Sequence, residues 1–266
     1  MMQPSKQIIG VFDSGIGGLS VLKHIHARLP NEPLVYLADS AFMPYGCKPP
    51  SIIEDRCLHI ADFFTKHHCK AIVLACNTAT AVSIHHLRKK YSYPIIGMEP
   101  AIKPAVIRSQ TGVIGVLVTN GTANSEKFNQ LKQRFGTHIN MIVQPCPGLV
   151  ESIEAGNTVN NTVVYEMLKG FLQPLLQQGI DTLVLGCTHY PFVIPLIRDI
   201  IGEHITIIDS GHAISCELER QLNLHHLRTP SKTIEPIQFW TSGDIQCVGS
   251  VISKLWQHPV SLRKMA

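Results

Sequence analysis

The chain has 266 residues, of which 45% are hydrophobic and 16% are charged, and its formal net charge at pH 7 is +4. This composition suits two domains of roughly 100–150 residues each and excludes a disordered chain, which combines low hydrophobicity with high net charge. The densest basic run, Arg88-Lys89-Lys90, contains no aromatic residue, so we do not expect nucleic acid as a partner. No apolar run approaches the roughly 18–20 residues that span a bilayer, and the stretch MMQPSKQIIG has no apolar h-region or cleavage signal, so we expect no signal peptide. We therefore expect a cytoplasmic protein with no membrane partner.

Short apolar runs alternate with longer amphipathic segments along the chain. Their near-continuous hydrophobic character is typical of parallel strands that are covered on both faces. In chain order, the expected strands are IIGVF (8–12), LVYLA (34–38), AIVLA (71–75), PIIG (94–97), VIGVLV (113–118), INMIVQ (139–144), TLVLG (182–186), ITIID (205–209) and IQFW (237–240). Helical spacing of apolar residues predicts helices at 16–29, 161–178 and 210–222. The alternation predicts an α/β fold with mainly parallel sheets flanked by helices.

Two features recur in the same order along the chain. The stretch GVFDSGIGG (10–18) resembles GVLVTNGT (115–122), at an offset of 115 − 10 = 105 residues. A cysteine follows a strand at Cys76 and again at Cys187, at an offset of 187 − 76 = 111 residues. We therefore expect two similar α/β domains related by a pseudo-twofold axis, with the active site in the cleft between them. The expected boundaries are 1–98 with 209–266 for the first domain, and 99–208 for the second.

Polar or reactive side chains follow several of the predicted strands. In open α/β sheets, ligands bind outside the carboxyl ends of the strands. The segments at these positions are Asp13-Ser14, Pro44-Tyr45-Gly46, Cys76-Asn77-Thr78, Thr119-Asn120-Gly121-Thr122 and Cys187-Thr188-His189. If the two domains face each other, all five segments line one cleft.

Cys76, in LACNTAT, and Cys187, in LGCTHYP, are the two cysteines placed for chemistry. Each is expected at a helix N-terminus, where unpaired backbone N–H groups favour the thiolate. No C-x-x-C pair is present, so we expect no zinc or other metal site. The remaining thiols are interpreted as buried or incidental, at Cys47, Cys57, Cys69, Cys146, Cys216 and Cys247.

Two reactive thiols narrow the possible chemistry. A cysteine hydrolase needs one thiolate and a histidine base, and a dithiol redox pair usually lies close in sequence. Two thiols on opposite walls of a cleft suit a symmetrical reaction. One thiolate removes a proton from one face of a carbon, and the other thiol returns a proton to the opposite face.

The motifs FDSGIGGLSV, PYGCK, ACNTATA and GCTHYP, with EPAIKPA at 99–105 and IDSG at 208–211, closely resemble those of the glutamate racemases. These enzymes belong to the cofactor-independent aspartate/glutamate racemase family and serve bacterial cell-wall precursor synthesis. The resemblance implies D-glutamate production for peptidoglycan, no cofactor and, since the family commonly dimerises, a homodimer. It implies that Cys76 and Cys187 are the acid/bases, assisted by Asp13 and His189. The implied substrate-binding residues are Asp13, Ser14, Pro44, Tyr45, Gly46, Asn77, Thr78, Thr119, Thr122, Thr188 and His189.

The resemblance also implies an auxiliary glutamate. The family pattern C-P-x-x-V-P-L-V-E-x-G maps it to Glu154, but this chain reads CPGLVESIEAG, with Glu151 in place of the usual proline. Both glutamates therefore stay candidates at this point.

Other interpretations remain open. An aspartate or other acidic amino-acid racemase is the nearest, and a cysteine hydrolase with His189 as its base is a more distant one. A nucleotide-binding module is suggested by Gly15 and Gly17 in the first loop and by Asp39 at the end of the next strand. However, Ser20 occupies the place of the third fingerprint glycine, and Asp13 would repel a pyrophosphate. Some of the predicted substrate-binding residues also have simpler interpretations: Asp13 and Thr122 as helix caps, and Pro44 and Tyr45 as turn residues.

Overall fold

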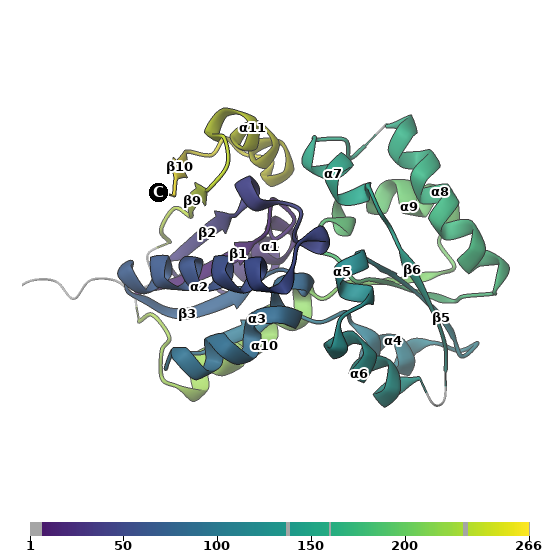
Figure 1. Cartoon of the computed structure of the whole chain (residues 1–266), viewed down its shortest axis with the longest axis horizontal. Coiled ribbons are helices and arrows are strands. Elements are labelled where there is room, and N and C mark those ends of the chain that lie inside the picture. The colour runs from purple at the N-terminus through teal and green to yellow at the C-terminus, as the bar shows by residue number, and fades with distance from the viewer. Residues whose placement is uncertain (1–6, 137–138, 160, 231–233, 266) are drawn as a thin grey trace, which may run out of the picture.

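The computed structural model describes residues 7–136, 139–159, 161–230 and 234–265, so the first six residues of the predicted first domain lie outside it. Two α/β domains lie side by side, each with a sheet between layers of helices (Figure 1). Within the described residues, every strand pairing is parallel. The predicted fold class is thus confirmed.

The first domain is built on a six-stranded sheet, as far as the described residues go, in the order β10-β9-β2-β1-β3-β4. Its strands are β1 (Ile8–Asp13), β2 (Leu34–Ala38), β3 (Cys69–Leu74), β4 (Ile95–Gly97), β9 (Gln238–Thr241) and β10 (Leu262–Lys264). One face is covered by α1 (Leu19–Arg28), α10 (Gly211–Leu224) and α11 (Ile245–Trp256), and the other by α2 (Pro50–Lys66) and α3 (Asn77–Lys90). Both faces are buried because Ile9 and Val11 of β1 point to one core, whereas Phe12 points to the other.

The second domain has a four-stranded sheet in its described part, in the order β6-β5-β7-β8. Its strands are β5 (Val113–Val118), β6 (Asn140–Pro145), β7 (Thr182–Leu185) and β8 (Thr206–Ile208). The helices are α4 (Ile102–Arg108), α5 (Asn120–Ala123), α6 (Glu126–Phe135), α7 (Leu149–Glu154), α8 (Thr162–Gln177) and α9 (Ile194–Ile201). Short 3₁₀ helices are also present in the described residues: η1 (Ser40–Phe42) and η2 (Tyr45–Cys47) in the first domain, and η3 (Tyr190–Val193) in the second.

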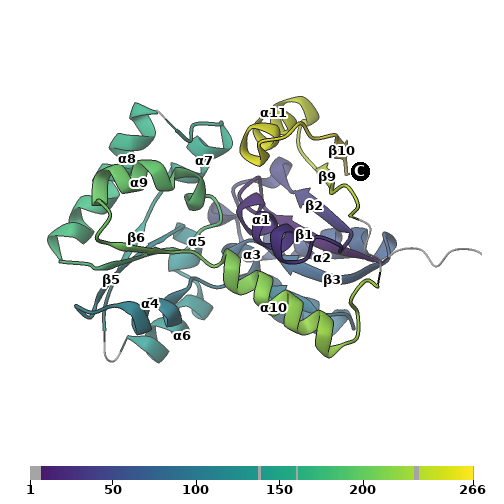
Figure 2. The same ribbon diagram turned by 180° about the vertical axis from the view of Figure 1, so that it is seen from behind.

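The two sheets repeat one topology, since β2-β1-β3-β4 and β6-β5-β7-β8 have the same order of first, second, third and fourth strands. The chain crosses between the domains twice, after β4 and after β8. The helix after β4, α4, packs on β7 of the second sheet, whereas the helix after β8, α10, packs on α1 of the first domain (Figure 2). Ser210 Oγ donates to Glu99 O at 2.7 Å and joins the two crossings. The proposed domain boundaries, between residues 98 and 99 and between residues 208 and 209, fall at these two crossings.

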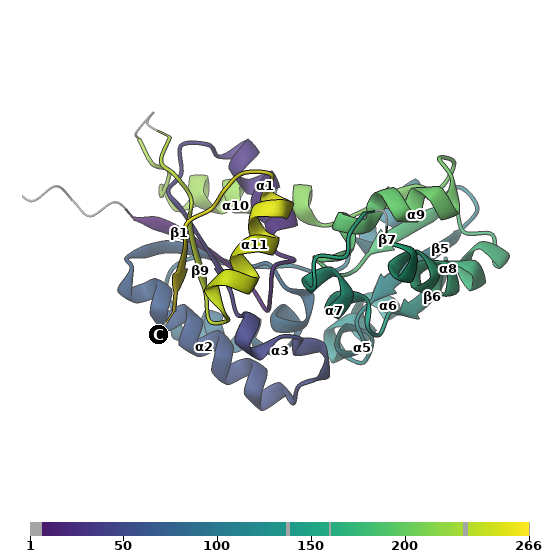
Figure 3. The same ribbon diagram turned by 90° about the horizontal axis from the view of Figure 1, so that it is seen from above.

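This topology explains where the polar segments meet. In each sheet, the second strand in the chain pairs on one side of the first strand, and the third strand pairs on the other side. A crevice therefore opens at the carboxyl ends of β1 and β3, and of β5 and β7. Seen from above, α3 of the first domain lies beside α5 of the second (Figure 3), so the two crevices face each other.

The predicted strands agree with the observed ones to within about two residues, but β10 was not predicted. Its sequence, Leu-Arg-Lys, lacks the continuous apolar run of a buried strand. The reason is that β10 lies at the edge of the sheet, pairs with β9 and has largely exposed side chains. The helix predicted at 16–29 begins only at Leu19, because the preceding residues form a turn around Asp13. Among the described helices, none is both long and apolar enough to cross a bilayer.

Candidate active site

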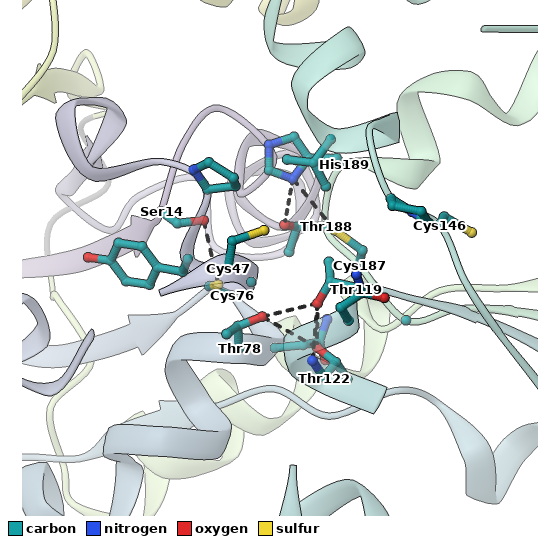
Figure 4. Close-up of a pocket in the computed structure, with 18 of the residues that line it drawn as sticks. Ser14, Cys47, Cys76, Thr78, Thr119, Thr122, Cys146, Cys187, Thr188 and His189 are labelled. Carbon is teal, nitrogen blue, oxygen red and sulfur yellow. Dashed lines mark hydrogen bonds between the residues drawn. The ribbon is translucent and has the colours of Figure 1, made fainter. Parts of the chain in front are cut away.

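A pocket between the two domains is lined by residues from all five predicted segments (Figure 4). They include every predicted substrate-binding residue except Asp13, which lies behind Ser14: Ser14, Pro44, Tyr45, Gly46, Asn77, Thr78, Thr119, Thr122, Thr188 and His189. Cys76 lines the pocket from the first domain and Cys187 from the second.

On the first wall, Asp13 ends β1 and is fully buried. Its Oδ1 accepts a hydrogen bond from Ser14 N and its Oδ2 one from Gly18 N, both at 2.7 Å. Thr188 Oγ1, from the second domain, donates to Oδ2 at 3.2 Å. Burial raises the pKa of Asp13, although the nearby His189 and the two N–H donors act in the opposite direction. This carboxylate therefore shapes the loop and also joins the two domains.

Cys76 lies at the N-cap of α3, and its Sγ accepts from Ala79 N at 3.4 Å. The thiol donates to Ser14 Oγ at 3.7 Å, and Ser14 Oγ donates to Asp13 Oδ1 at 3.3 Å (Figure 4). Burial raises the pKa of Cys76 well above its usual range, and the charge of Asp13 adds to this effect. These two effects outweigh the helix N-terminus, so the prediction that Cys76 favours the thiolate is wrong. Its resting form is the neutral thiol.

On the second wall, Cys187 follows Gly186 beyond the end of β7. Its Sγ lies 3.6 Å from His189 Nδ1, and His189 Nε2 lies 2.6 Å from Glu154 Oε1. Burial by itself lowers the pKa of His189, but the contacts with Cys187 and Glu154 raise it well above the ordinary value. The imidazole therefore lies between a sulfur and a carboxylate, and both contacts favour its protonated form.

The structure separates the two candidate glutamates. Glu154 contacts His189, and its Oε1 also accepts from Ile16 N at 2.7 Å, across the domain boundary. Glu151, one turn earlier on α7, lines the pocket instead. Glu154 is thus the residue placed to assist the second wall.

The glycines of the first loop serve close packing between the domains. A Cβ on Gly15 would collide with the Glu154 carboxylate, and one on Gly17 would collide with the His189 ring. Both glycines therefore allow side chains of the second domain to approach the backbone of the first. This explains the glycine pattern without a bound phosphate. The carboxylate of Asp39 is already bound by Arg56 and Tyr45, so it is not free for a ribose.

One side of the pocket is a hydroxyl cluster formed by Thr78, Thr119 and Thr122. The Oγ1 atom of Thr78 lies 3.3 Å from that of Thr119 and 3.4 Å from that of Thr122, and Thr119 Oγ1 lies 3.1 Å from Thr122 Oγ1 (Figure 4). Thr119 also caps α5 by accepting from Thr122 N. The cluster combines the first domain's Thr78 with two hydroxyls of the second, so it is complete only when the domains meet.

Asn77 is buried, and neither its amide oxygen nor its amide nitrogen has a partner in the described structure. Buried polar groups are ordinarily hydrogen-bonded. Because Asn77 lines the pocket, a ligand that both accepts and donates hydrogen bonds fits beside it. Among the described residues lining the pocket, none is lysine or arginine, and no described group of three His, Cys, Asp or Glu side chains is placed to hold a metal.

Sequence reasoning missed several pocket residues. Cys47 and Cys146 were interpreted as incidental, yet both line the pocket. Cys146 directly follows the carboxyl end of β6, so the strand-end rule would have found it. Cys47 directly follows the Pro44-Tyr45-Gly46 segment. The other additional residues are Pro147, Gly148, Val150 and Gly186.

The fold and the pocket define an enzyme of two α/β domains with Cys76 on one wall of the pocket between them and Cys187 on the other. The family model of Asp/Glu/Hydantoin racemase matches residues 9–215, and the chain belongs to this family.

Among curated proteins, a glutamate racemase of Ectopseudomonas mendocina is 47% identical over 255 residues, which is 96% of each chain. One of Pseudomonas aeruginosa is 46% identical over 258 residues, or 97% of each chain. The crystal structure of a glutamate racemase isoform from Bacillus anthracis superposes with a TM-score of 0.88 at 31% identity, covering 99% of this chain and 98% of that one. That of Escherichia coli glutamate racemase, solved with L-glutamate and the activator UDP-MurNAc-ala, gives 0.86 at 30% identity and covers 98% of each.

Proposed function

We propose that the protein is an isomerase that interconverts L- and D-glutamate without pyridoxal phosphate, by proton transfer between Cα and two thiols. The observation that carries this proposal is that Cys76 and Cys187, from different domains, line one pocket. Close relatives over nearly the whole chain are glutamate racemases, which supports glutamate as the substrate.

The two walls differ in the groups beside each sulfur. On the second wall, His189 Nδ1 lies 3.6 Å from Cys187 Sγ, and the contacts with Cys187 and Glu154 favour the protonated imidazole, so Cys187 is the base. On the first wall, Cys76 is the thiol and therefore the acid. Cys187 removes the Cα proton from one face of the substrate, and Cys76 delivers its own proton to the other face. One proton leaves the carbon and one arrives, so no redox partner is needed.

The reverse direction needs Cys76 as the base. Its proton has a route to Asp13 through Ser14 Oγ, and burial raises the pKa of Asp13 so that the carboxylate can receive it. On the second wall, His189 transfers its proton to Cys187, and Cys187 then delivers it to the carbon as the acid, with Glu154 beside the imidazole. Asp13 thus assists its cysteine indirectly, whereas His189 contacts its cysteine.

A Cα proton is far less acidic than a thiol, so the pocket must stabilise the carbanion-like state. The hydroxyl cluster and the unpartnered amide of Asn77 provide hydrogen bonds for the substrate carboxylate. Thiol and imidazole groups buried at the domain interface act in a medium with little water, which strengthens these interactions. Domain closure around the substrate is the expected conformational step.

The wider role follows from the product. D-glutamate made in the cytoplasm would supply peptidoglycan synthesis, and glutamate is the proposed small-molecule partner. A homodimer is proposed from the resemblance alone, and sedimentation velocity measures it directly.

A cysteine hydrolase is favoured by one observation, the Cys187–His189–Glu154 arrangement, which has the order of a nucleophile, base and orienting acid. It gives no role to Cys76. Loss of activity on replacing Cys76 with alanine supports the racemase, and an acyl-enzyme that survives this replacement supports the hydrolase.

Proton NMR of D- and L-glutamate in deuterated water tests the proposed activity, with aspartate as the competing substrate. The purified protein should replace Cα–H with deuterium and invert both glutamate enantiomers. Faster inversion of aspartate than glutamate would overturn the proposed substrate, and absence of inversion with both would overturn the proposed reaction.

A further inference from the structure

Asp39 is a buried carboxylate that the proposed proton transfers do not use. It directly follows β2 and is fully buried. Arg56 of α2 holds it with two hydrogen bonds, from Nε to Oδ2 at 3.0 Å and from Nη2 to Oδ1 at 2.8 Å. Tyr45 Oη donates to the same Oδ2 at 2.6 Å. A buried charge needs such partners, and here they are supplied by one helix and one loop.

Arg56 also holds a second aromatic side chain. Its guanidinium lies 3.9 Å from the centroid of the Phe42 ring, and only 15% of the Arg56 side chain is exposed. A planar guanidinium can bind a carboxylate at its edge and an aromatic ring on its face at the same time. The segment 40–47, which we call the pocket loop, is therefore fixed at both Phe42 and Tyr45.

The pocket loop borders the substrate pocket. Pro44, Tyr45, Gly46 and Cys47 all line it. Tyr45 lines the pocket while its hydroxyl is bound to Asp39, so the same residue belongs to the pocket wall and to the anchor.

The same loop touches the second domain. A Cβ on Gly46 would lie 3.3 Å from Thr119 Cβ, and one on Gly121 would lie 2.9 Å from Gly46 O. The backbone of the pocket loop is thus packed directly on the turn that carries the hydroxyl cluster. Small displacements of the loop would move Thr119 or open a gap beside it.

We propose that Asp39 and Arg56 are positioning residues for substrate binding, acting through Tyr45 to hold the pocket loop against Thr119. They touch neither the substrate nor the reacting atoms. The inference rests on the proposed function, because it assigns the anchored loop to glutamate binding in that pocket. Since the two thiols are not part of the anchor, its loss changes affinity more than the chemical step.

Tyr45→Phe tests the inference most cleanly, because it removes the hydroxyl that binds Asp39 and keeps the aromatic ring. A hydrogen bond to a charged partner changes an equilibrium by roughly 10- to 100-fold. We expect the KM for both enantiomers to rise about tenfold while kcat changes less than about twofold. Hydrogen–deuterium exchange of residues 40–47 should be faster than in the wild type.

Tyr91→Phe is the matched control. Tyr91 Oη donates to Asp62 Oδ1 at 2.5 Å, so it also joins a tyrosine to an aspartate, but neither residue lines the pocket. Its KM, kcat and exchange in the pocket loop should equal those of the wild type.

Arg56→Lys is the second variant, because lysine keeps the charge but cannot form the two-point contact. Its KM should lie between those of the wild type and Arg56→Met. The inference is overturned if Tyr45→Phe and Arg56→Lys both keep wild-type KM, or if kcat falls instead of affinity. A wild-type protein that does not racemise glutamate refutes the proposed function instead, and a pocket loop that exchanges equally fast in Tyr45→Phe and wild type refutes the anchor itself.

Discussion

Glu154→Gln is the replacement that bears most directly on how the second wall works. Glu154 Oε1 accepts from Ile16 N at 2.7 Å and lies 2.6 Å from His189 Nε2, and only 6% of its side chain is exposed. Glutamine has the same shape and can keep the Ile16 contact, but it removes the charge that helps to hold His189 as a cation. Without that charge, the imidazole beside Cys187 loses one of the two contacts that favour its protonated form, and we expect the step at Cys187 to become slower.

The size of the effect follows from the contact. A hydrogen bond to a charged group contributes about 1.5–3 kcal/mol, and each 1.4 kcal/mol changes a rate tenfold. We therefore expect kcat/KM to fall roughly 10- to 100-fold. It must fall equally for both enantiomers, because the equilibrium constant between mirror images is one and no variant can change it. Glu151 lies one turn away and does not contact His189, so the fall in kcat/KM for Glu151→Gln should be at least about tenfold smaller than that for Glu154→Gln.

The assay is polarimetry of each enantiomer, with and without deuterium at Cα. When the step at Cys187 becomes slower, the isotope effect should grow for the enantiomer whose Cα proton Cys187 removes. The isotope effect should shrink for the enantiomer whose Cα proton Cys76 removes. The reasoning is refuted if kcat/KM stays within about threefold of the wild type, or if both isotope effects change alike.

Three further outcomes follow. Burial lowers the pKa of His189, but the contacts with Cys187 and Glu154 outweigh burial and raise it above its ordinary value. The protonated His189 therefore stabilises the folded state fully below the unfolded pKa near 6.5, and this contribution is lost as pH rises through the folded pKa. In urea titrations above pH 7, the free energy of unfolding should therefore fall more steeply for the wild type than for His189→Asn, and parallel curves contradict this. Gly17→Ala forces a methyl group into the His189 ring and should lower kcat by about 100-fold in steady-state assays, so unchanged kcat refutes the packing role. Lys70→Met breaks the buried 2.6 Å pair with Glu32 and should lower stability by about 3 kcal/mol with unchanged KM, and a thermal melt equal to the wild type contradicts it.

The meeting of Cys76 and Cys187 could be predicted because parallel sheets bring the carboxyl ends of their strands to one edge. Each cysteine follows an apolar run, and the repeat along the chain placed the two runs at equivalent strands. Cys146 directly follows the carboxyl end of β6 and obeys the same rule, so its place at the pocket could also be predicted from the sequence.

Other features depend on side-chain placement that no local pattern encodes. Ser14 lies between Cys76 and Asp13 because Asp13 accepts the N–H groups of its own loop. The thiolate prediction for Cys76 failed because burial and the charge of Asp13 raise the pKa of the thiol more than the helix N-terminus lowers it. Glu151 and Glu154 could not be distinguished because they lie one turn apart on α7, and only its docking decides which reaches His189.

The central claim is that two thiols act on opposite faces of one carbon, and deuterium incorporation by the single variants Cys76→Ala and Cys187→Ala tests it most directly. The account predicts that neither variant inverts glutamate. Each should exchange the Cα proton of only one enantiomer, with configuration retained, and the two variants should exchange opposite enantiomers. Inversion by either variant, or exchange of the same enantiomer by both, would contradict it.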